Sequence, residues 1–419
     1  MTEETQNRFP DFADVVVVGG GIAGLGLACA LTQHGLGVMV IEKRRTTGGI
    51  HRGDSLLPKA TALLHRWGVL DAIRAANARP IGRLEVHARG HGELFATSLV
   101  NENAPYPYLV LPHARIESVL MAEALRRGAV IARPAKALGT LTDPLGRVCG
   151  VRFEIAGESR EVRARVVVAA DGARSVVRRD LGIEGYCHRY DHAYLGLEAD
   201  RPAAYDDAMR VHLDPAGGLL VMPRPDRVGL GVLVDSGTAR HWMTITDEEL
   251  ARDLTRRAPI LSGMKLYRDG AHVYELTRSH ADRYVHRGAV IIGDAAHTTN
   301  PTAGQGMAMA LTDAGALADR LSAAIAAGGA PTALDLALAD YEQTQWPANE
   351  AVIRASHRLA VAYGLRGRKC HALETALLRI LGSGLGTAIA RPIIATFLHR
   401  ADDASSDKVA GHLVRRGAP

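Results

Sequence analysis

Near its N-terminus the chain reads Val15-Val-Val-Val-Gly-Gly-Gly-Ile-Ala-Gly24, and this segment determines the expected architecture. An unbroken β-branched run is typical of a parallel strand that is covered on both faces. The alanine-rich residues 25–34 predict a helix directly after the glycines, and the apolar residues 38–41 predict a second strand. Strand, glycine turn, helix and strand together form a βαβ unit, whose crossover is right-handed.

The glycines of the Gly-x-Gly-x-x-Gly spacing have separate physical roles. Gly19 permits a tight turn, Gly21 a close approach of the backbone to a pyrophosphate, and Gly24 close packing of the helix against the strand. The amides at the start of the helix, around Ile22 and Ala23, then bind the anion. Because a glycine-rich turn without function has the same spacing, the interpretation depends on the residues that follow.

Glu42 ends the second expected strand, where an acidic side chain accepts hydrogen bonds from the hydroxyl groups of a ribose. A carboxylate there would repel a ribose 2′-phosphate, so the site favours the ADP half of FAD or NAD over NADP. Lys43 and the two arginines after it would instead suit a 2′-phosphate, but we interpret them as a solvated basic turn. Lys43 is kept among the expected cofactor-binding residues.

Two further glycine turns follow buried strands. Residues 166–175 read Val-Val-Val-Ala-Ala-Asp-Gly-Ala-Arg-Ser, which places Asp171 and Gly172 in a turn. Residues 289–297 read Ala-Val-Ile-Ile-Gly-Asp-Ala-Ala-His, with Asp294 in the turn and a helix expected to begin near Gly304. Each turn alone is a common structural element, so the information lies in their combination and order.

The three motifs, in this order, resemble those of the single-component flavin-dependent monooxygenases of the para-hydroxybenzoate hydroxylase type. The similarity covers roughly residues 13–345, and the segment from Gly293 to Gly306 is its most specific part. Arg52-Gly53-Asp54 and the chain length are similar to the branch that includes ubiquinone-biosynthesis hydroxylases and natural-product tailoring hydroxylases. The resemblance implies bound FAD, with NADH or NADPH as a transient electron donor.

The resemblance also implies a place for each motif along FAD. Glycines 19, 21 and 24 would hold the pyrophosphate, Glu42 the adenosine ribose and Asp294 the ribityl chain, while Arg174 would lie near the nicotinamide and Arg52 near the flavin or the donor. His113 stands where many members have arginine or glutamine. The expected cofactor-binding residues are Gly19, Gly21, Ile22, Ala23, Gly24, Glu42, Lys43, Arg52, His113, Asp171, Gly172, Arg174, Asp294, Pro301, Gly304, Gln305 and Gly306.

The helix expected after Gly304 has an independent physical role. Reduced flavin carries negative charge at N1 and O2, and a helix N-terminus presents about half a positive charge and free N–H groups. Glycine at 304 and 306 allows the backbone to approach the ring, which Pro301 would border. Asn300 and Ala308 depart from the family pattern, which often has proline and asparagine at these positions.

The expected fold is α/β, with a Rossmann-like FAD-binding domain, an inserted β-sheet-rich substrate domain and a C-terminal helical segment. Residues from Tyr186 to Leu276 are mostly strand-like, and residues 57–76 predict a helix. The expected divisions are 13–80, 108–185 and 278–340 for the FAD-binding domain, 81–107 and 186–277 for the substrate domain, 341–404 for the C-terminal helices and 405–419 for a disordered tail.

Composition narrows the functional classes. Of 419 residues, 47% are hydrophobic and only 5% are aromatic, with a net charge of +5, which fits a globular protein and disfavours nucleic-acid binding. The 4 cysteines stand far apart and no metal-ligand spacing occurs, so we expect neither a disulfide framework nor a metal site, and a cytoplasmic setting. No stretch is apolar enough to span a membrane. The segment from Thr375 to Leu398 predicts a buried or amphipathic helix, so peripheral contact with a membrane surface stays as an alternative.

The preferred hypothesis is an FAD-dependent hydroxylase that uses NAD(P)H and O₂ to insert one oxygen atom into an aromatic or other electron-rich apolar molecule, through a flavin C4a-hydroperoxide. Two alternatives remain: an FAD-dependent reductase or dehydrogenase of an isoprenoid-like or polycyclic substrate, and a flavin-binding protein without turnover. His192, Tyr194 and His212 are candidates for a base, and none is assigned. The substrate, the choice of nicotinamide and the oligomeric state stay open.

Overall fold

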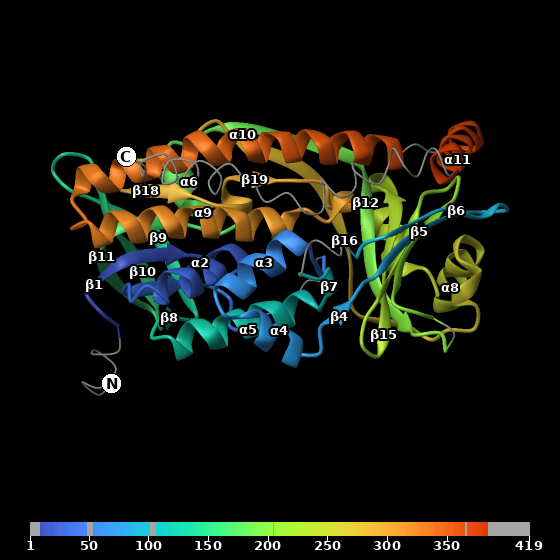
Figure 1. Ribbon diagram of the computed structural model, residues 1–419, viewed down its shortest axis with the longest axis horizontal. Helices are drawn as coiled ribbons and strands as arrows, with labels where there is room; N and C mark the ends of the chain where they lie inside the picture. The colour runs from blue at the N-terminus through green and yellow to red at the C-terminus, as the bar shows by residue number, and fades with distance from the viewer. Residues whose placement is uncertain (1–8, 48–52, 101–105, 204, 365–366, 384–419) are drawn as a thin grey trace, which may run out of the picture.

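The computed structural model describes residues 9–47, 53–100, 106–203, 205–364 and 367–383 (Figure 1). The molecule is elongated, with a largely parallel sheet and its helices at one end and a strongly curved, mostly antiparallel sheet at the other. The long helix α10 (Pro331–Tyr363) runs along one side and connects the two ends. This is the α/β architecture expected from the sequence.

The first sheet contains the strands that carry the three motifs. Its order is β17 (Val285–His286), β18 (Ala289–Ile291), β11 (Glu158–Ala169), β1 (Phe12–Val18), β2 (Val38–Ile41) and β8 (Val130–Ala132). In addition, β10 (Val148–Ile155) pairs antiparallel with β11, and β9 (Ala135–Thr142) pairs antiparallel with β10. Val18 pairs in parallel with both Ala169 and Ile41, and Ala169 pairs with Ile291. The turns that follow these strands therefore begin side by side at one edge of the sheet.

Helices cover this sheet and bury its apolar strands. The covering helices are α2 (Ile22–Thr32), α3 (Pro58–Arg66), α4 (Leu70–Ala75), α5 (His113–Arg126), α6 (Val176–Asp180) and α9 (Gly306–Ala326). The helix α2 lies against α9, which in turn lies under α10 (Figure 1). A Cβ atom at Gly26 would lie 2.8 Å from Leu311, so glycine permits the close contact between α2 and α9.

The second sheet draws on separate parts of the chain. Its order is β19 (His297–Thr298), β16 (Leu266–Ala281), β12 (Gly185–Asp200), β15 (Arg227–Asp235), β14 (Leu219–Pro223), β13 (Ala208–Leu213), β5 (Arg83–Ala88) and β6 (Gly92–Ser98). A small third sheet joins β3 (Ser55–Leu56), β7 (Leu109–Val110) and β4 (Arg79–Pro80). The strands β5 and β6 thus belong to the same sheet as the segment that follows Tyr186.

The structure refines two expectations about local structure. The segment 186–276 is mostly strand, as expected, and it also contains α7 (Ala239–Thr244) and α8 (Asp247–Arg257). A capping box between Thr246 and Glu249 starts α8, and that signal is visible in the sequence. The helix expected over 57–76 is divided into α3 and α4 at Gly68, which has a φ of +65° that favours glycine.

The C-terminal part is helical as far as the structure describes it. α10 is followed by α11 (Arg368–Gly382), which lies at the far end of the antiparallel sheet, against β6 (Figure 1). The tail predicted at 405–419 and the apolar residues after Ser383 lie outside the described residues, as does Arg52. In the described part of the chain, no helix combines the length and the apolar character needed to cross a membrane.

Candidate active site

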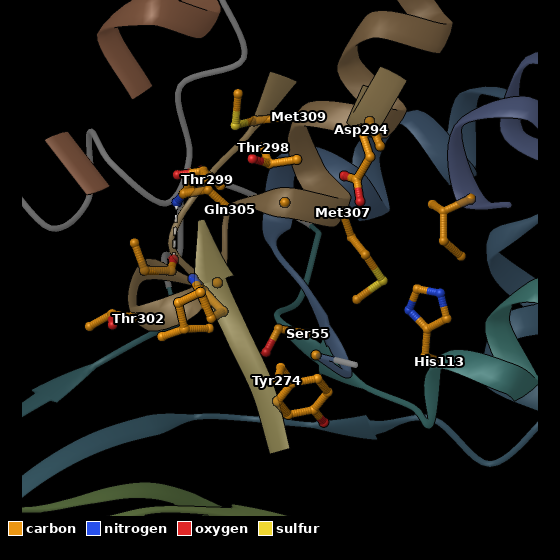
Figure 2. A pocket seen from close by; sticks show the side chains of 18 of the residues that line it. Ser55, His113, Tyr274, Asp294, Thr298, Thr299, Thr302, Gln305, Met307 and Met309 are labelled. Atoms are coloured by element: carbon orange, nitrogen blue, oxygen red, sulfur yellow. Dashed lines mark hydrogen bonds between the residues drawn. The ribbon is translucent and has the colours of Figure 1, made fainter. Parts of the chain in front are cut away.

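A single continuous cavity of about 2440 Å³ extends from the carboxyl edge of the parallel sheet to the antiparallel sheet and α11. It brings together nearly all of the residues that the sequence singles out. Those that line it are Gly19, Gly21, Ile22, Ala23, Glu42, Lys43, His113, Asp171, Gly172, Arg174, Asp294, Pro301, Gly304, Gln305 and Gly306. Figure 2 shows Asp294, Met307 and His113 projecting into one part of this space, with Thr302 and Tyr274 also on its wall.

The glycine turn shapes one end of the cavity. Gly19 has a φ of +109°, and a Cβ atom there would lie 2.2 Å from the Ala170 carbonyl oxygen. Gly24 does not line the cavity: its Cβ would lie 2.0 Å from the carbonyl oxygen of Gly19, so it serves helix–strand packing. At Gly21 the nearest atom to a Cβ is 4.0 Å away, so a side chain there would project into the cavity.

The N-terminus of α2 opens onto this end of the cavity. Its N-cap, Gly21, makes no side-chain hydrogen bond, and the first turn contains no acidic residue. The first amides of the helix therefore remain available, and the partial positive charge of the helix end is not neutralised. Such an end is suited to an anionic group such as a pyrophosphate.

Glu42 is almost completely buried and is fixed by the glycine turn. Its Oε2 accepts a hydrogen bond of 2.7 Å from the Gly20 amide, and its Oε1 accepts one of 2.7 Å from the Arg44 amide. The Arg44 guanidinium bridges Glu42 and Glu117. Burial opposes ionisation of Glu117, but His113 and Arg44 together lower the pKa of Glu117 to about 2. Glu42 Oε1 also accepts from Arg44 Nε at 3.1 Å, whereas Oε2 accepts from the Gly20 amide and retains a further lone pair for a hydroxyl group.

His113 is the first residue of α5. Its backbone amide donates to Asp54, its Nε2 lies 3.4 Å from Glu117, and its Nδ1 is buried with no hydrogen-bond partner among the described residues. Because this ring lines the cavity, its Nδ1 is available to a bound molecule. Contact of His113 with the cofactor stays a prediction of the resemblance.

The Asp171–Gly172 turn follows β11. Asp171 accepts a 2.7 Å hydrogen bond from the Val176 amide through Oδ2, while its Oδ1 is buried with no hydrogen-bond partner in the described part of the chain. Gly172 has a φ of +87°, which the tight turn requires. Arg174 is exposed at the rim of the cavity, where a transient ligand can reach it.

The Gly293–Asp294 turn rests on a buried polar network. The Asp313 carboxylate accepts hydrogen bonds from the Gly293 amide (2.9 Å), from His297 Nε2 (2.7 Å) and from Asn349 Nδ2 (2.9 Å). Asp313 has no exposed surface, so these donors compensate for the loss of water. The network thereby fixes the turn from which Asp294 faces the cavity.

The helix α9 begins at Gly306, close to the position expected from the sequence. A short 3₁₀ helix, Pro301–Ala303, precedes it, and Asn300 caps that turn by accepting from the Thr302 amide. Gly304 has a φ of +64°. The N-terminus of α9 has no side-chain cap and no acidic residue in its first turn, so its amides face the cavity unneutralised.

Beyond α9 the cavity widens into an apolar chamber against the antiparallel sheet. The apolar side chains that line it include Leu84, Val86, Met209, Val211, Leu220, Met222, Leu230 and Leu276. Of the three candidate bases, only Tyr194 lines the cavity; its hydroxyl lies 3.3 Å from that of Thr302, which in turn donates to Asn300. Burial raises the pKa of Tyr194 to about 12.

His192 and His212 are buried within the sheet and do not line the cavity. His192 contacts Asp191, and His212 stacks on His87 with ring centroids 5.0 Å apart. Burial, His87 and Arg210 lower the pKa of His212 to about 4. Neither histidine reaches the chamber, so neither is placed to act as a base on a molecule bound there.

Sequence reasoning missed several residues of the chamber, Tyr274 and Tyr363 among them. A Cβ atom at Gly196 would lie 2.5 Å from the Tyr274 hydroxyl, and one at Gly218 would lie 2.0 Å from the Tyr363 hydroxyl. These glycines, in and beside strands, make room for the large side chains opposite. Glycine in an otherwise apolar strand signals such a close approach, and this signal was present in the sequence.

The site defines a class of protein that holds an extended dinucleotide. Two uncapped helix N-termini, a buried ribose-type carboxylate and the glycine turn face one elongated cavity, which fits FAD. A sequence model described as "FAD binding domain" matches residues 12–356. The chain belongs to this family of flavin-dependent monooxygenases.

Individual relatives agree with this assignment. The chain is 31% identical over 343 residues to ubiquinone hydroxylase UbiL of Rhodospirillum rubrum, covering 80% of this chain and 78% of that protein. It is 29% identical over 318 residues to 3-demethoxyubiquinol 3-hydroxylase of Escherichia coli, covering 74% and 79%. The crystal structure of PqsL from Pseudomonas aeruginosa in complex with 2-aminobenzoylacetate is similar with a TM-score of 0.76 at 26% identity, covering 87% and 99%.

These comparisons confirm the function expected from the motifs. The protein is an FAD-dependent aromatic hydroxylase, and NAD(P)H is the typical electron donor of its family. The reductase and the non-catalytic flavin-binding protein, which the sequence left as alternatives, are not supported by the relatives.

Proposed function

We propose that FAD lies extended along the cavity, with its adenosine ribose at Glu42, its pyrophosphate at the N-terminus of α2 and its ribityl chain at Asp294. The flavin ring then rests between Pro301 and the N-terminus of α9. The spacing of these groups along one cavity supports the proposal. Lys43, His113, Arg174 and the Asp171–Gly172 turn border the same path; Arg52 belongs to the proposed set by resemblance alone.

The observation that carries the proposal is the position of α9. Its uncapped N-terminus faces the cavity between two parts: the part lined by the glycine turn, Glu42 and Asp294, and the apolar chamber. Backbone amides there stabilise negative charge on the N1–O2 edge of a reduced flavin. The chemistry that bound FAD supplies is acceptance of electrons from NAD(P)H and insertion of one oxygen atom of O₂ into the substrate.

We propose that the chamber binds an aromatic or lipophilic small molecule. Its apolar walls exclude water from the reacting atoms and leave few polar groups to orient the substrate. Tyr194 and Thr302 form a hydrogen-bonded pair on its wall, beside the proposed ring site. Burial raises the pKa of Tyr194 to about 12, so Tyr194 stays neutral. Because Thr302 donates to Asn300, Tyr194 donates to Thr302, and the Tyr194 oxygen accepts a hydrogen bond from a substrate hydroxyl and orients it.

The same proposal divides the chain into functional parts. Residues 13–80, 108–185 and 278–340 would hold FAD, residues 81–107 and 186–277 the substrate, and 341–404 the C-terminal helices. The membership of β5 and β6 in the antiparallel sheet supports this division, although β16 crosses its boundary at 277. Use of NAD(P)H and the free thiols of Cys29, Cys149 and Cys187 fit a cytoplasmic setting.

The test combines flavin content with product mass. The purified protein is expected to be yellow, to be reduced by NADH or NADPH without O₂, and to add one oxygen atom to an electron-rich phenol when O₂ is admitted. Asp294→Ala should purify without flavin, whereas Asp319→Ala, an exposed ion-pair residue on α9, should retain it. Full flavin content in Asp294→Ala would refute the placement of the ribityl chain.

A further inference from the structure

The end of the cavity farthest from the parallel sheet is formed by α11. This helix contributes Leu373, Glu374, Leu377, Leu378 and Leu381 to the wall. Leu373 and Leu377 are 61% and 53% exposed, so α11 marks the place where the chamber reaches solvent. Figure 1 shows α11 at the end of the molecule opposite the parallel sheet.

Glu374 is a carboxyl group in this otherwise apolar wall. It is half-buried, and no hydrogen bond or ion pair joins it to another residue that the structure describes. Burial alone raises its pKa to about 7. An acidic side chain without a partner in an apolar wall has a desolvation cost that a bound donor group would offset.

Tyr363, the last residue of α10, borders the same region of the cavity. Its buried hydroxyl lies beside that of Tyr194, and burial, Tyr194 and Glu374 raise the pKa of Tyr363. Tyr363 and Glu374 both line the cavity. Glu374 is therefore the polar group of this wall that lacks a partner among the described residues.

Arg224 also lines the cavity, but its charge is not available to bind an acidic group of a substrate. The Arg224 guanidinium donates to Asp54 through Nε (2.7 Å) and Nη2 and to Glu198 through Nη1. Two carboxylates neutralise its charge, and Arg224 and Asp54 are both buried. The charge balance at this arginine and at Glu374 favours a basic group over an acidic one in the substrate.

We propose that Glu374 binds a hydrogen-bond donor, an ammonium group in preference to a hydroxyl, at the end of the substrate opposite the ring that is hydroxylated. This inference rests on the proposed function, since it takes the reacting ring to lie beside α9. The substrate class is an elongated aromatic molecule with an apolar body and a distal amino group. The open mouth at α11 lets an ammonium keep part of its hydration while it pairs with the carboxylate.

The test uses a series of para-alkylphenols of graded chain length that end in an amino, hydroxyl, methyl or carboxyl group. Binding to the FAD-loaded protein is followed by the change in flavin absorbance. At the best chain length, the amino-ended probe should bind about tenfold more tightly than the methyl-ended probe, with the hydroxyl-ended probe between them and the carboxyl-ended probe weakest. A charged hydrogen bond of this kind requires the ionised Glu374 carboxylate. The preference for the amino-ended over the methyl-ended probe should therefore weaken as the pH is lowered below 7.

Variants identify the residue responsible. Glu374→Gln should reduce the amino-over-methyl preference to threefold or less, while Glu248→Gln, an exposed acid on α8, should keep it at about tenfold. Three results would each overturn this inference but not the proposed function. They are equal binding of the amino- and methyl-ended probes to the natural protein, tightest binding of the carboxyl-ended probe, and an undiminished preference for the amino-ended probe in Glu374→Gln. If no phenol of the series perturbs the flavin, the proposed substrate chamber fails together with this inference.

Discussion

Glu42 links the glycine turn to the proposed ribose site through a single carboxylate. Its oxygens already hold the amides of Gly20 and Arg44, so the side chain is oriented before any ligand arrives. Glu42→Ala removes the ribose acceptor and releases these amides, and should weaken FAD binding by about 1.5–3 kcal/mol. Titration of the flavin-free protein with FAD measures this change.

The matched control for Glu42 is an acid of the same sheet that lies outside the cavity. Glu161 on β11 is in an exposed ion pair with Arg152, and Glu161→Ala should leave the affinity for FAD unaltered. An unaltered affinity in Glu42→Ala would remove the carboxylate from the proposed ribose site.

His212 makes folding stability depend on pH. Its pKa of about 4 in the folded protein lies below the ordinary 6.5, because of burial and of the neighbouring His87 and Arg210; Glu85 opposes them. The unfolded chain therefore binds a proton that the folded chain does not, so the stability that His212 provides is present above pH 6.5 and is lost as the pH falls toward 4. At pH 5 this loss amounts to about 2 kcal/mol.

A substitution isolates that contribution. Urea unfolding of the natural protein and of His212→Leu at pH 7 and pH 5 gives the free energy of unfolding under each condition. The loss between pH 7 and pH 5 should be smaller by about 2 kcal/mol in His212→Leu, because leucine does not titrate. Equal losses in the two proteins would show that His212 does not carry this pH dependence.

At the residue scale, sequence reasoning identified motif residues better than chamber residues. Gly19, Glu42 and Asp294 stand at fixed places after strands, so their spacing alone indicates their chemistry. Tyr274 and Glu374 have no such local signal. Which face of a strand or helix meets the cavity depends on register and packing, and a single sequence does not determine these.

Among the elements, α10 supports the Gly293–Asp294 turn through Asn349. The Asn349 amide donates to Asp313 and, at 3.2 Å, to the Tyr284 hydroxyl, which is also hydrogen-bonded to His280. Asn349→Leu leaves the buried Asp313 carboxylate with one donor fewer, which should cost about 1–3 kcal/mol of folding free energy. The affinity for FAD should fall as well, since the Gly293 amide binds the same carboxylate.

Two measurements separate the effects of Asn349→Leu. Urea unfolding of the flavin-free protein reports the stability, and FAD titration reports the affinity. Gln343→Leu, on an exposed face of the same helix, serves as the control and should change neither quantity. A destabilised Asn349→Leu protein with natural FAD affinity would show that the network holds α10 but not the turn.

The elements that sequence predicted well are those with strong local signals. β1, α2 and β2 combine an apolar run, a glycine turn and an alanine-rich helix, and each local preference agrees with the final structure. The helix α8 has an equally clear capping box, yet the surrounding strand-like sequence concealed it. To predict the break between α3 and α4, one would need the φ of Gly68, which tertiary packing sets.

For the whole molecule, convergence of the motifs was predictable because parallel strands place their carboxyl ends at one edge. The pairing of Val18, Ile41, Ala169 and Ile291 fulfils that geometry. The contact between the two large parts of the molecule was not predictable. It includes an ion pair between Asp54 and Arg224, which are far apart in the sequence and carry no motif in common.

The ion pair between Asp54 and Arg224 joins the loop before β3 to the turn between β14 and β15, and it provides the last prediction. Removing one partner leaves a buried charge uncompensated, so Asp54→Asn or Arg224→Gln alone should cost about 3–5 kcal/mol of folding free energy. Asp54→Asn should lie at the low end of that range, because Arg224 keeps Glu198 and because burial raises the pKa of Asp54.

The double variant Asp54→Asn/Arg224→Gln tests whether the pair acts as a unit. The effects of substituting two residues in contact are not additive. The free energy of unfolding lost in the double variant should therefore be smaller than the sum of the two single losses by about 1 kcal/mol or more. Urea unfolding of the four flavin-free proteins at one pH gives the four free energies. Additive losses would mean that each side chain stabilises its own part of the molecule and that the two parts are held together by apolar packing instead.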